Sequence, residues 1–218
     1  VIMTDSSTLT VGLADRAYDI TVGRALIGRI DEIAGAQLAG RHVVIIADAA
    51  VAPHHLAPLE SACNRVCRRV DSLTVASGEA SKSMAVLASL LEDILALGVD
   101  RDVVLVALGG GVIGDLAGFA AASLLRGVDF IQVPTTLLAQ VDSSVGGKTG
   151  VNAAAGKNLI GAFHQPRAVL IDIDTLATLP ARELRAGYAE VIKYGLLGDA
   201  AFFEWLEAHG GEVLDRDE

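Results

Sequence analysis

The segment from residue 109 to 114 is the first place where residue types and spacing could do chemistry. It reads GGGVIG, and the pattern G-x-G-x-x-G is matched by Gly109, Gly110, Gly111, Val112, Ile113 and Gly114. Glycines let the backbone turn tightly and approach a pyrophosphate, whose charge is favoured by the N–H groups and dipole of a helix start. The pattern predicts a dinucleotide site, and a purely structural turn is the alternative.

An acidic residue for the ribose hydroxyls of such a cofactor is missing from its usual place. About 20 residues after the glycines, where that residue normally stands, an apolar run ends instead in Pro134 and Thr135. Asp48, which ends the apolar run VVIIAD, is a candidate substitute.

Lysine is rare in this chain, and its few positions are informative. Of the 17 basic residues 13 are arginine, and only Lys82, Lys148, Lys157 and Lys193 are lysine. A chain that uses arginine wherever a positive charge suffices is expected to keep lysine where a compact ammonium is needed. Ordinary surface lysines are the alternative.

The run SGEASK, residues 77–82, lies where a strand pattern passes into a helical one. Glu79 and Lys82 could hold a polar ligand at the edge of a sheet, or Ser81 could simply cap the helix. The later run GGKTG does not make a P-loop, because Asp142 stands where the first glycine of that motif is required. The polar stretch 140–152 around it is expected to be poor core material.

Glu190 lies in a helical pattern with Lys193 three residues later, which is the spacing of a surface ion pair. A metal-ligand role is the alternative, although the five histidines show no metal-binding spacing. Cys63 and Cys67 form no CxxC motif and are expected to be inert thiols.

Apolar runs alternate with helical patterns along most of the chain, which indicates βαβ units. Strands are expected at 9–13, 18–22, 43–47, 72–76, 103–108, 130–133 and 169–173, the first two as a hairpin, and helices at 51–65, 81–97 and 114–125. The sequence predicts an α/β fold of the Rossmann-like type, a parallel sheet with helices on both faces and its ligand site at the carboxyl ends of the strands. After Thr178 only helices are expected, so residues 1–178 are predicted as an α/β domain and 179–218 as the start of an incomplete all-α domain.

Composition narrows the class of protein. The 218 residues are 52% hydrophobic and only 4% aromatic, which excludes intrinsic disorder and disfavours an aromatic-rich β-sandwich. A net charge of −10 repels nucleic acids and anionic membranes. With no apolar run long enough to span a bilayer and no signal pattern, we expect a cytoplasmic protein that binds neither nucleic acid nor membrane.

Four motifs in order, LGGGVIGDLAGFAAASLLRG, VPTTLLAQVDSSVGGKTGVN, GKNLIGAFHQP and GYAEVIKYG, closely resemble the 3-dehydroquinate synthase family. The resemblance covers about residues 40–205 and includes all four lysines. It implies an N-terminal NAD-binding domain, a helical domain with metal and substrate ligands, and a homodimer.

The resemblance also implies roles for individual residues. Those implied to contact NAD are Asp48, Ser77, Gly78, Glu79, Ala80, Ser81, Lys82, Gly109, Gly110, Gly111, Val112, Ile113, Gly114, Asp115, Thr135, Thr136, Lys148, Lys157, Thr175, Leu176, Ala177 and Thr178. Those implied to act on the substrate are Asp142, Lys148, Asn158, Lys193 and, from the other subunit, Arg126. Glu190 is implied to be one ligand of a divalent metal, zinc or else cobalt.

The reaction implied is conversion of 3-deoxy-D-arabino-heptulosonate 7-phosphate, a phosphorylated sugar acid, to 3-dehydroquinate and phosphate. It would proceed by transient NAD-dependent oxidation, phosphate elimination, reduction, ring opening and aldol closure. Other sugar-phosphate cyclases and the glycerol-dehydrogenase type are related alternatives, and a non-catalytic NAD-binding fragment is a third. Asp115 is expected to serve NAD without a role in the core.

We predict that Lys148→Arg damages turnover more than a charge-conserving change normally does, because the guanidinium fork is bulkier and aims its donors differently. Steady-state kinetics of the complete natural protein checks this. Wild-type turnover of the variant would contradict it.

Overall fold

The computed structural model describes residues 6–215. Its strands are β1 (Ser7–Val11), β2 (Tyr18–Gly23), β3 (His42–Asp48), β4 (Arg69–Val75), β5 (Val104–Gly109), β6 (Asp129–Pro134), β7 (Lys148–Ala153), β8 (Gly156–Phe163) and β9 (Ala168–Asp172). Its α-helices are α1 (Ile30–Ile33), α2 (Gly35–Leu38), α3 (Ala52–Cys63), α4 (Met84–Ala96), α5 (Gly111–Ser123), α6 (Ala181–Leu196) and α7 (Ala200–Asp215). Short helical turns are η1 (Ala14–Arg16), η2 (Ile27–Arg29), η3 (Glu79–Ser81), η4 (Leu124–Arg126), η5 (Ala139–Ser143), which is a π-turn, and η6 (Ile173–Thr178).

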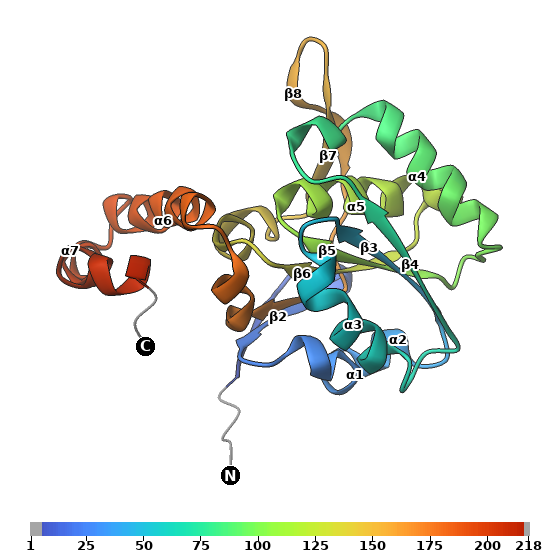
Figure 1. Ribbon diagram of the computed structural model, residues 1–218, viewed down its shortest axis with the longest axis horizontal. Coiled ribbons are helices and arrows are strands. Elements are labelled where there is room, and N and C mark those ends of the chain that lie inside the picture. The colour runs from blue at the N-terminus through green and yellow to red at the C-terminus, as the bar shows by residue number, and fades with distance from the viewer. Residues whose placement is uncertain (1–5, 216–218) are drawn as a thin grey trace.

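The main sheet has seven strands in the order β1-β2-β9-β6-β5-β3-β4. Every neighbouring pair is parallel except the edge hairpin β1–β2, which is antiparallel. This arrangement confirms the predicted Rossmann-like α/β fold and the amino-terminal hairpin. Figure 1 shows α4 and α5 on one side of the sheet and α1, α2 and α3 on the other.

Both faces of the sheet are buried, which explains why its strands read as unbroken apolar runs. In β3, Val44 and Ile46 pack into the core under α4 and α5, whereas Val43 and Ile45 pack into the core under α1 and α3. All four side chains are fully buried. Alternation of faces along a strand requires apolar residues at every position when helices cover both sides.

The helical part after Thr178 consists of α6 and α7, which contact each other. α6 also contacts the π-turn η5, and Figure 1 shows the two helices beside the sheet rather than over it. The boundary at residue 178 stays a prediction, and residues 1–5 and 216–218 of the two predicted domains lie outside the described residues. Within residues 6–215, no helix is both long and apolar enough to cross a membrane.

The start of α4 corrects one expectation. The predicted helix 81–97 begins only at Met84, because Ser83 is its N-cap and accepts a hydrogen bond from the Val86 N–H at 3.4 Å. Ser81 is therefore not the cap. Its hydroxyl donates to the Ala76 carbonyl at 2.6 Å and closes the preceding loop.

The hairpin of β7 and β8 is an element that the sequence did not predict. It forms a separate antiparallel two-stranded sheet against α5, and it protrudes at the top of Figure 1. The expectation that the polar stretch would not be core material is wrong for its last part, since Thr149, Gly150 and Val151 are buried. Gly150 lies opposite Gly161, so the paired backbones can approach closely.

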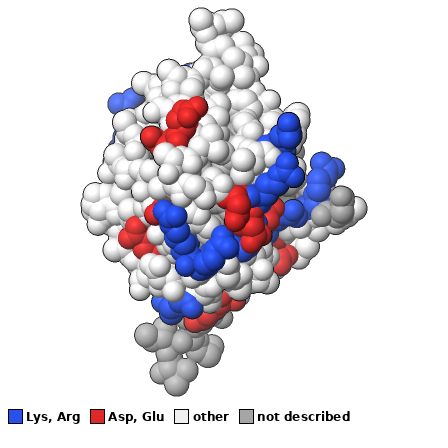
Figure 2. All heavy atoms as spheres, turned by 90° about the vertical axis from the view of Figure 1, so that its right-hand side faces the viewer, with Lys and Arg blue, Asp and Glu red and all other residues white. Residues whose placement is uncertain are grey.

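Basic and acidic side chains lie close together on one face of the molecule. Figure 2 shows Lys and Arg side chains mixed with Asp and Glu on the face at the right of Figure 1. Around the starts of β3 and β4, the ion pairs are Arg41–Asp129, Arg68–Asp100 and Arg69–Asp71. The arginines there are therefore paired with neighbouring carboxylates.

We predict that Gly161→Ala destabilises the hairpin by about 2 kcal/mol, the usual cost of forcing extra volume into a packed site. A methyl group there would overlap the Thr149 carbonyl oxygen. Urea unfolding measures the effect, with Gly35→Ala as the control because a methyl group at residue 35 meets nothing within 4 Å. Equal stability of the two variants would contradict this account of the hairpin.

Candidate functional site

A cavity of about 830 Å³ lies at the carboxyl ends of the parallel strands, where the sequence placed the ligand site. The predicted site residues on its wall are Asp48, Ser77, Gly78, Glu79, Lys82, Gly110, Gly111, Val112, Asp115, Thr135, Thr136, Lys157, Asn158 and Thr178. They follow β3, β4, β5 and β6 in turn, with the β7–β8 turn and the start of α6 closing the sides. Residues far apart in the sequence thus meet because parallel strands end at one edge.

The first turn of α5 faces this cavity without a side-chain cap. Gly110 is the N-cap, and no side chain of the described residues accepts a hydrogen bond from the turn. The first N–H groups of a helix have no intrahelical acceptor, so they favour an anion in front of them. A Cβ at Gly110 would lie 2.9 Å from Thr136 Cγ2, so glycine is needed for the close packing of the turn on the next loop.

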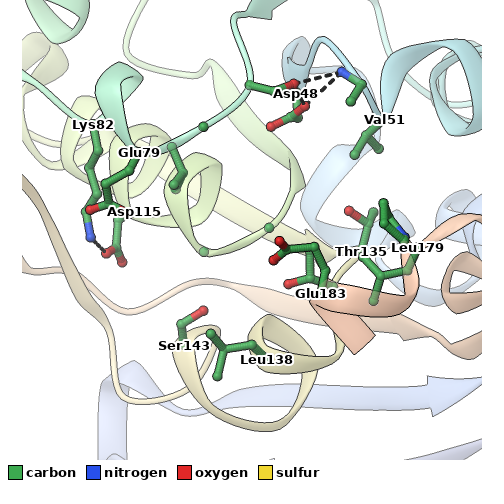
Figure 3. Close-up of a pocket in the computed structure, with 18 of the residues that line it drawn as sticks. Asp48, Val51, Glu79, Lys82, Asp115, Thr135, Leu138, Ser143, Leu179 and Glu183 are labelled. Carbon is green, nitrogen blue, oxygen red and sulfur yellow. Dashed lines mark hydrogen bonds and ion pairs between the residues drawn. The ribbon is translucent and has the colours of Figure 1, made fainter. Parts of the chain in front are cut away.

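Asp48 ends β3, and Figure 3 draws it apart from the Lys82–Asp115 ion pair. Its Oδ1 accepts hydrogen bonds from the Ala50 N–H at 2.8 Å and from the Ser77 hydroxyl. Two donors on one oxygen hold the carboxylate in place. An acidic side chain near the strand ends of such a fold can accept hydrogen bonds from ribose hydroxyls.

Lys82 and Asp115 form a buried ion pair on the cavity wall, drawn side by side in Figure 3. Their side chains are 7% and 18% exposed, and the Lys82 ammonium also donates to Asn158 Oδ1 at 2.5 Å. Burial raises the pKa of the Asp115 carboxyl above its usual range, and the hydrogen bond from Lys82 only partly opposes the shift. Asp115 therefore has a buried partner that the sequence did not predict, and its role toward NAD stays a prediction.

Glu79 is held at the mouth of the cavity. Its Oε1 accepts a hydrogen bond from Asn152 Nδ2 at 2.7 Å and lies 3.5 Å from the exposed Lys157 ammonium. The hydrogen bond from Asn152 lowers the pKa of the Glu79 carboxyl, and Lys157 and Lys82 add to the effect. Glu79 consequently stays ionised at neutral pH.

Thr135 presents an unused polar group to the cavity. The residue is 3% exposed, and among the described residues its Oγ1 has no hydrogen-bond partner although it is buried. Buried hydroxyls without partners are rare in native proteins, and a catalytic role or a bound water or ion can account for one. Thr175, by contrast, is turned inward, where its hydroxyl donates to the Asp172 carbonyl at 2.7 Å and accepts from Gln140 at 3.0 Å.

Other predicted cofactor contacts are not on this wall. A Cβ at Gly114 would meet Gln132 Oε1 at 2.7 Å, and Gly109 is similarly close to Ile113, so both glycines serve packing. The predicted contacts that do not line the cavity in the described structure are Ala80, Ser81, Gly109, Ile113, Gly114, Lys148, Thr175, Leu176 and Ala177.

Lys148 lines a second hollow of about 330 Å³ under the β7–β8 hairpin. Asp115 and Asn158 border both hollows, so the two adjoin at these side chains. Three further predicted substrate residues line neither hollow: Asp142 is exposed in the π-turn, Lys193 is exposed on α6, and Arg126 is exposed after α5 with a φ of 71°.

Glu190 and Lys193 form an ion pair one helical turn apart on α6. Residues 6–215 contain no group of three or more His, Cys, Asp or Glu side chains arranged to hold a metal ion. One carboxylate is not enough, because protein zinc sites normally use three or four ligands. The metal-ligand role of Glu190 thus remains a prediction, because the described residues do not supply a full set of ligands.

The sequence missed several wall residues. His55 Nε2 lies 2.9 Å from Thr178 Oγ1, and the Thr178 hydroxyl itself donates to the Thr175 carbonyl at 3.0 Å. His55 must therefore be the donor to Thr178. Burial, then the neighbouring His54, lowers the pKa of His55, so it is neutral at pH 7. The remaining unpredicted wall residues are Ala50, Val51, His54, Leu138, Ser143, Leu179, Pro180 and Glu183.

The sheet order, the uncapped glycine-rich turn and the cavity at the strand ends define the Rossmann-like class of α/β protein. The family model described as 3-dehydroquinate synthase N-terminal matches residues 72–186, and the chain belongs to this family.

Individual relatives agree with that assignment. The chain is 59% identical over 211 residues to a 3-dehydroquinate synthase of Caulobacter vibrioides, covering 96% of this chain and 57% of the relative. It is similar in structure to ValA, a 2-epi-5-epi-valiolone synthase of Streptomyces hygroscopicus subsp. jinggangensis 5008 solved with NAD+ and Zn2+ (TM-score 0.80, 34% identity, 94% of this chain and 56% of that one). It is also similar to 2-deoxy-scyllo-inosose synthase complexed with carbaglucose-6-phosphate, NAD+ and Co2+ (TM-score 0.79, 32% identity, 86% and 50% covered). The chain spans 50–57% of the length of these relatives.

We predict that Asp115→Ala destabilises the protein by about 3 kcal/mol, because it leaves the Lys82 ammonium buried without its counter-charge. The double variant Lys82→Met/Asp115→Ala should recover most of that loss, since it removes the stranded charge as well. Urea unfolding of the wild type and the variants checks both expectations. If adding Lys82→Met to Asp115→Ala lowered the free energy of unfolding further instead of restoring it, the two side chains would not be coupled.

Proposed function

We propose that the protein containing this chain is a 3-dehydroquinate synthase that binds NAD in the 830 Å³ cavity. The observation that carries the proposal is the uncapped first turn of α5 on the wall of a cavity that Asp48 and the Lys82–Asp115 pair also line. Family membership and the relatives' names support the activity. NAD supplies the transient acceptance and return of a hydride when it is bound.

The residues of the chain fit NAD at three points. The N–H groups at the start of α5 would hold the pyrophosphate, the Asp48 carboxylate would accept hydrogen bonds from the adenosine ribose, and the unpartnered Thr135 hydroxyl would satisfy its hydrogen bond on the cofactor. The buried Lys82 ammonium already has two partners, so its proposed part is to fix Asp115 and Asn158 in the wall.

The substrate would lie next to the cofactor, toward the hollow that Lys148 lines. Lys148 is exposed and lines the same hollow as Asn158, and its ammonium suits the carboxylate or phosphate of 3-deoxy-D-arabino-heptulosonate 7-phosphate. Asp142, Lys193 and Arg126 remain proposed substrate contacts by resemblance. Arg126 is exposed beyond the end of α5, and its proposed role depends on a homodimer.

The described residues do not fit a divalent metal on their own, because Glu190 belongs to no group of three or more His, Cys, Asp or Glu side chains placed to hold one among them. No step is therefore assigned to a metal. Zinc or cobalt, with Glu190 as one ligand, is proposed only for the complete protein, as are its location in the cytoplasm and its dimeric state.

Two preparations test the proposed function. The complete natural protein should bind NAD, release phosphate from the heptulosonate phosphate and show no net rise in absorbance at 340 nm, since NAD is regenerated in each turnover. The 218-residue chain should bind NAD weakly, retain no stoichiometric zinc and release no phosphate, because one carboxylate holds a metal poorly.

Net accumulation of NADH by the complete protein would identify a dehydrogenase of the glycerol-dehydrogenase type instead. Failure of the complete protein to bind NAD would overturn the proposal. Stoichiometric metal with turnover in the 218-residue chain would show that the metal ligands are misplaced.

A further inference from the structure

Asn152, near the end of β7, makes three hydrogen bonds to two segments of the site although its own side chain does not line the cavity in the described structure. Its Nδ2 donates to Glu79 Oε1 at 2.7 Å, and its Oδ1 accepts from the Asn158 N–H at 3.0 Å. Its backbone N–H donates to the Lys82 carbonyl at 2.9 Å. One residue thus joins the loop after β4 to the β7–β8 turn.

These contacts need a side chain that donates at one end and accepts at the other. The Asn158 N–H can only donate and the ionised Glu79 carboxylate can only accept, so the orientation of the Asn152 amide is set by its two partners. An aspartate has the same shape but would place a second carboxylate against Glu79. A serine is too short to reach both groups.

The Asn158 end of this link holds an uncommon backbone conformation. Asn158 has a φ of 58°, in the left-handed region that residues other than glycine seldom adopt. In that conformation its N–H points to Asn152, while its own Oδ1 accepts from the buried Lys82 ammonium. A change in the Asn152 amide therefore reaches the Lys82–Asp115 pair through Asn158.

We infer that Asn152 is a positioning residue, whose amide fixes the Glu79 carboxylate and the Asn158 backbone so that this wall of the cavity is formed before NAD binds. The inference deepens the proposed function and rests on it. Nothing in the motif resemblance gives Asn152 this role. Because the wall is already ordered, the free energy of NAD binding does not include a cost of ordering it.

Isothermal titration calorimetry of NAD with the complete natural protein tests the inference. Asn152→Asp should weaken NAD binding about tenfold, the size expected for losing a hydrogen bond to a charged group. In a Glu79→Gln background the same change should weaken NAD binding by less than about threefold. The new amide at position 79 can then donate to the new carboxylate at position 152. A role in general stability alone would not produce this rescue.

Asn152→Ser provides a second variant that adds no charge. It should also weaken NAD binding, and Glu79→Gln should not rescue it. Asn64→Asp is the matched control, since Asn64 is exposed at the end of α3 away from the cavity wall and should leave NAD affinity unchanged. Thermal unfolding of each variant confirms that it is folded.

The outcomes separate the two claims. If the wild-type protein does not bind NAD, the proposed function fails. If the wild type binds NAD and Asn152→Asp binds it equally well, or loses the same affinity in both backgrounds, the positioning role is wrong and the proposed function stands.

Discussion

The buried pair of Lys82 and Asp115 is the interaction on which the arrangement of the site depends. Lys82 follows η3, Asp115 belongs to α5, and Asn158, the third member, comes from β8. An ammonium that is 7% exposed is costly to bury unless its partners surround it. The three segments must therefore meet at this point, and the wall they form follows from their meeting.

That constraint also explains how the start of α5 can remain open. The other side of the turn is packed through Gly110 against Thr136 and through Gly114 against Gln132, where no Cβ would fit. With α5 fixed by packing and by the Asp115 side chain, its first N–H groups need no side-chain cap for support. They stay available for an anion, with the unpartnered Thr135 hydroxyl nearby on the same wall.

The sheet and the glycine-rich turn could be predicted from sequence because their signals are local. β3 and β5 are unbroken apolar runs, and the turn follows one of them directly. The β7–β8 hairpin gave no such signal, since its buried residues Thr149 and Gly150 are typical of loops, and only the fold places Ala162 and Gly161 opposite them. His55 was missed for a related reason: its partner Thr178 is 123 residues away, and no short motif connects them. Glu79 and Lys82 were expected to face a ligand together, but Lys82 forms an ion pair with Asp115. This pairing could be found only from the fold.

A crystal structure of the protein with NAD tests the central claim most directly. The account predicts the pyrophosphate against the N–H groups at the start of α5, the adenosine ribose on the Asp48 carboxylate, and the Lys82–Asp115 pair unchanged beneath the cofactor. A cofactor bound elsewhere, or one that separates Lys82 from Asp115 to enter the cavity, would contradict it.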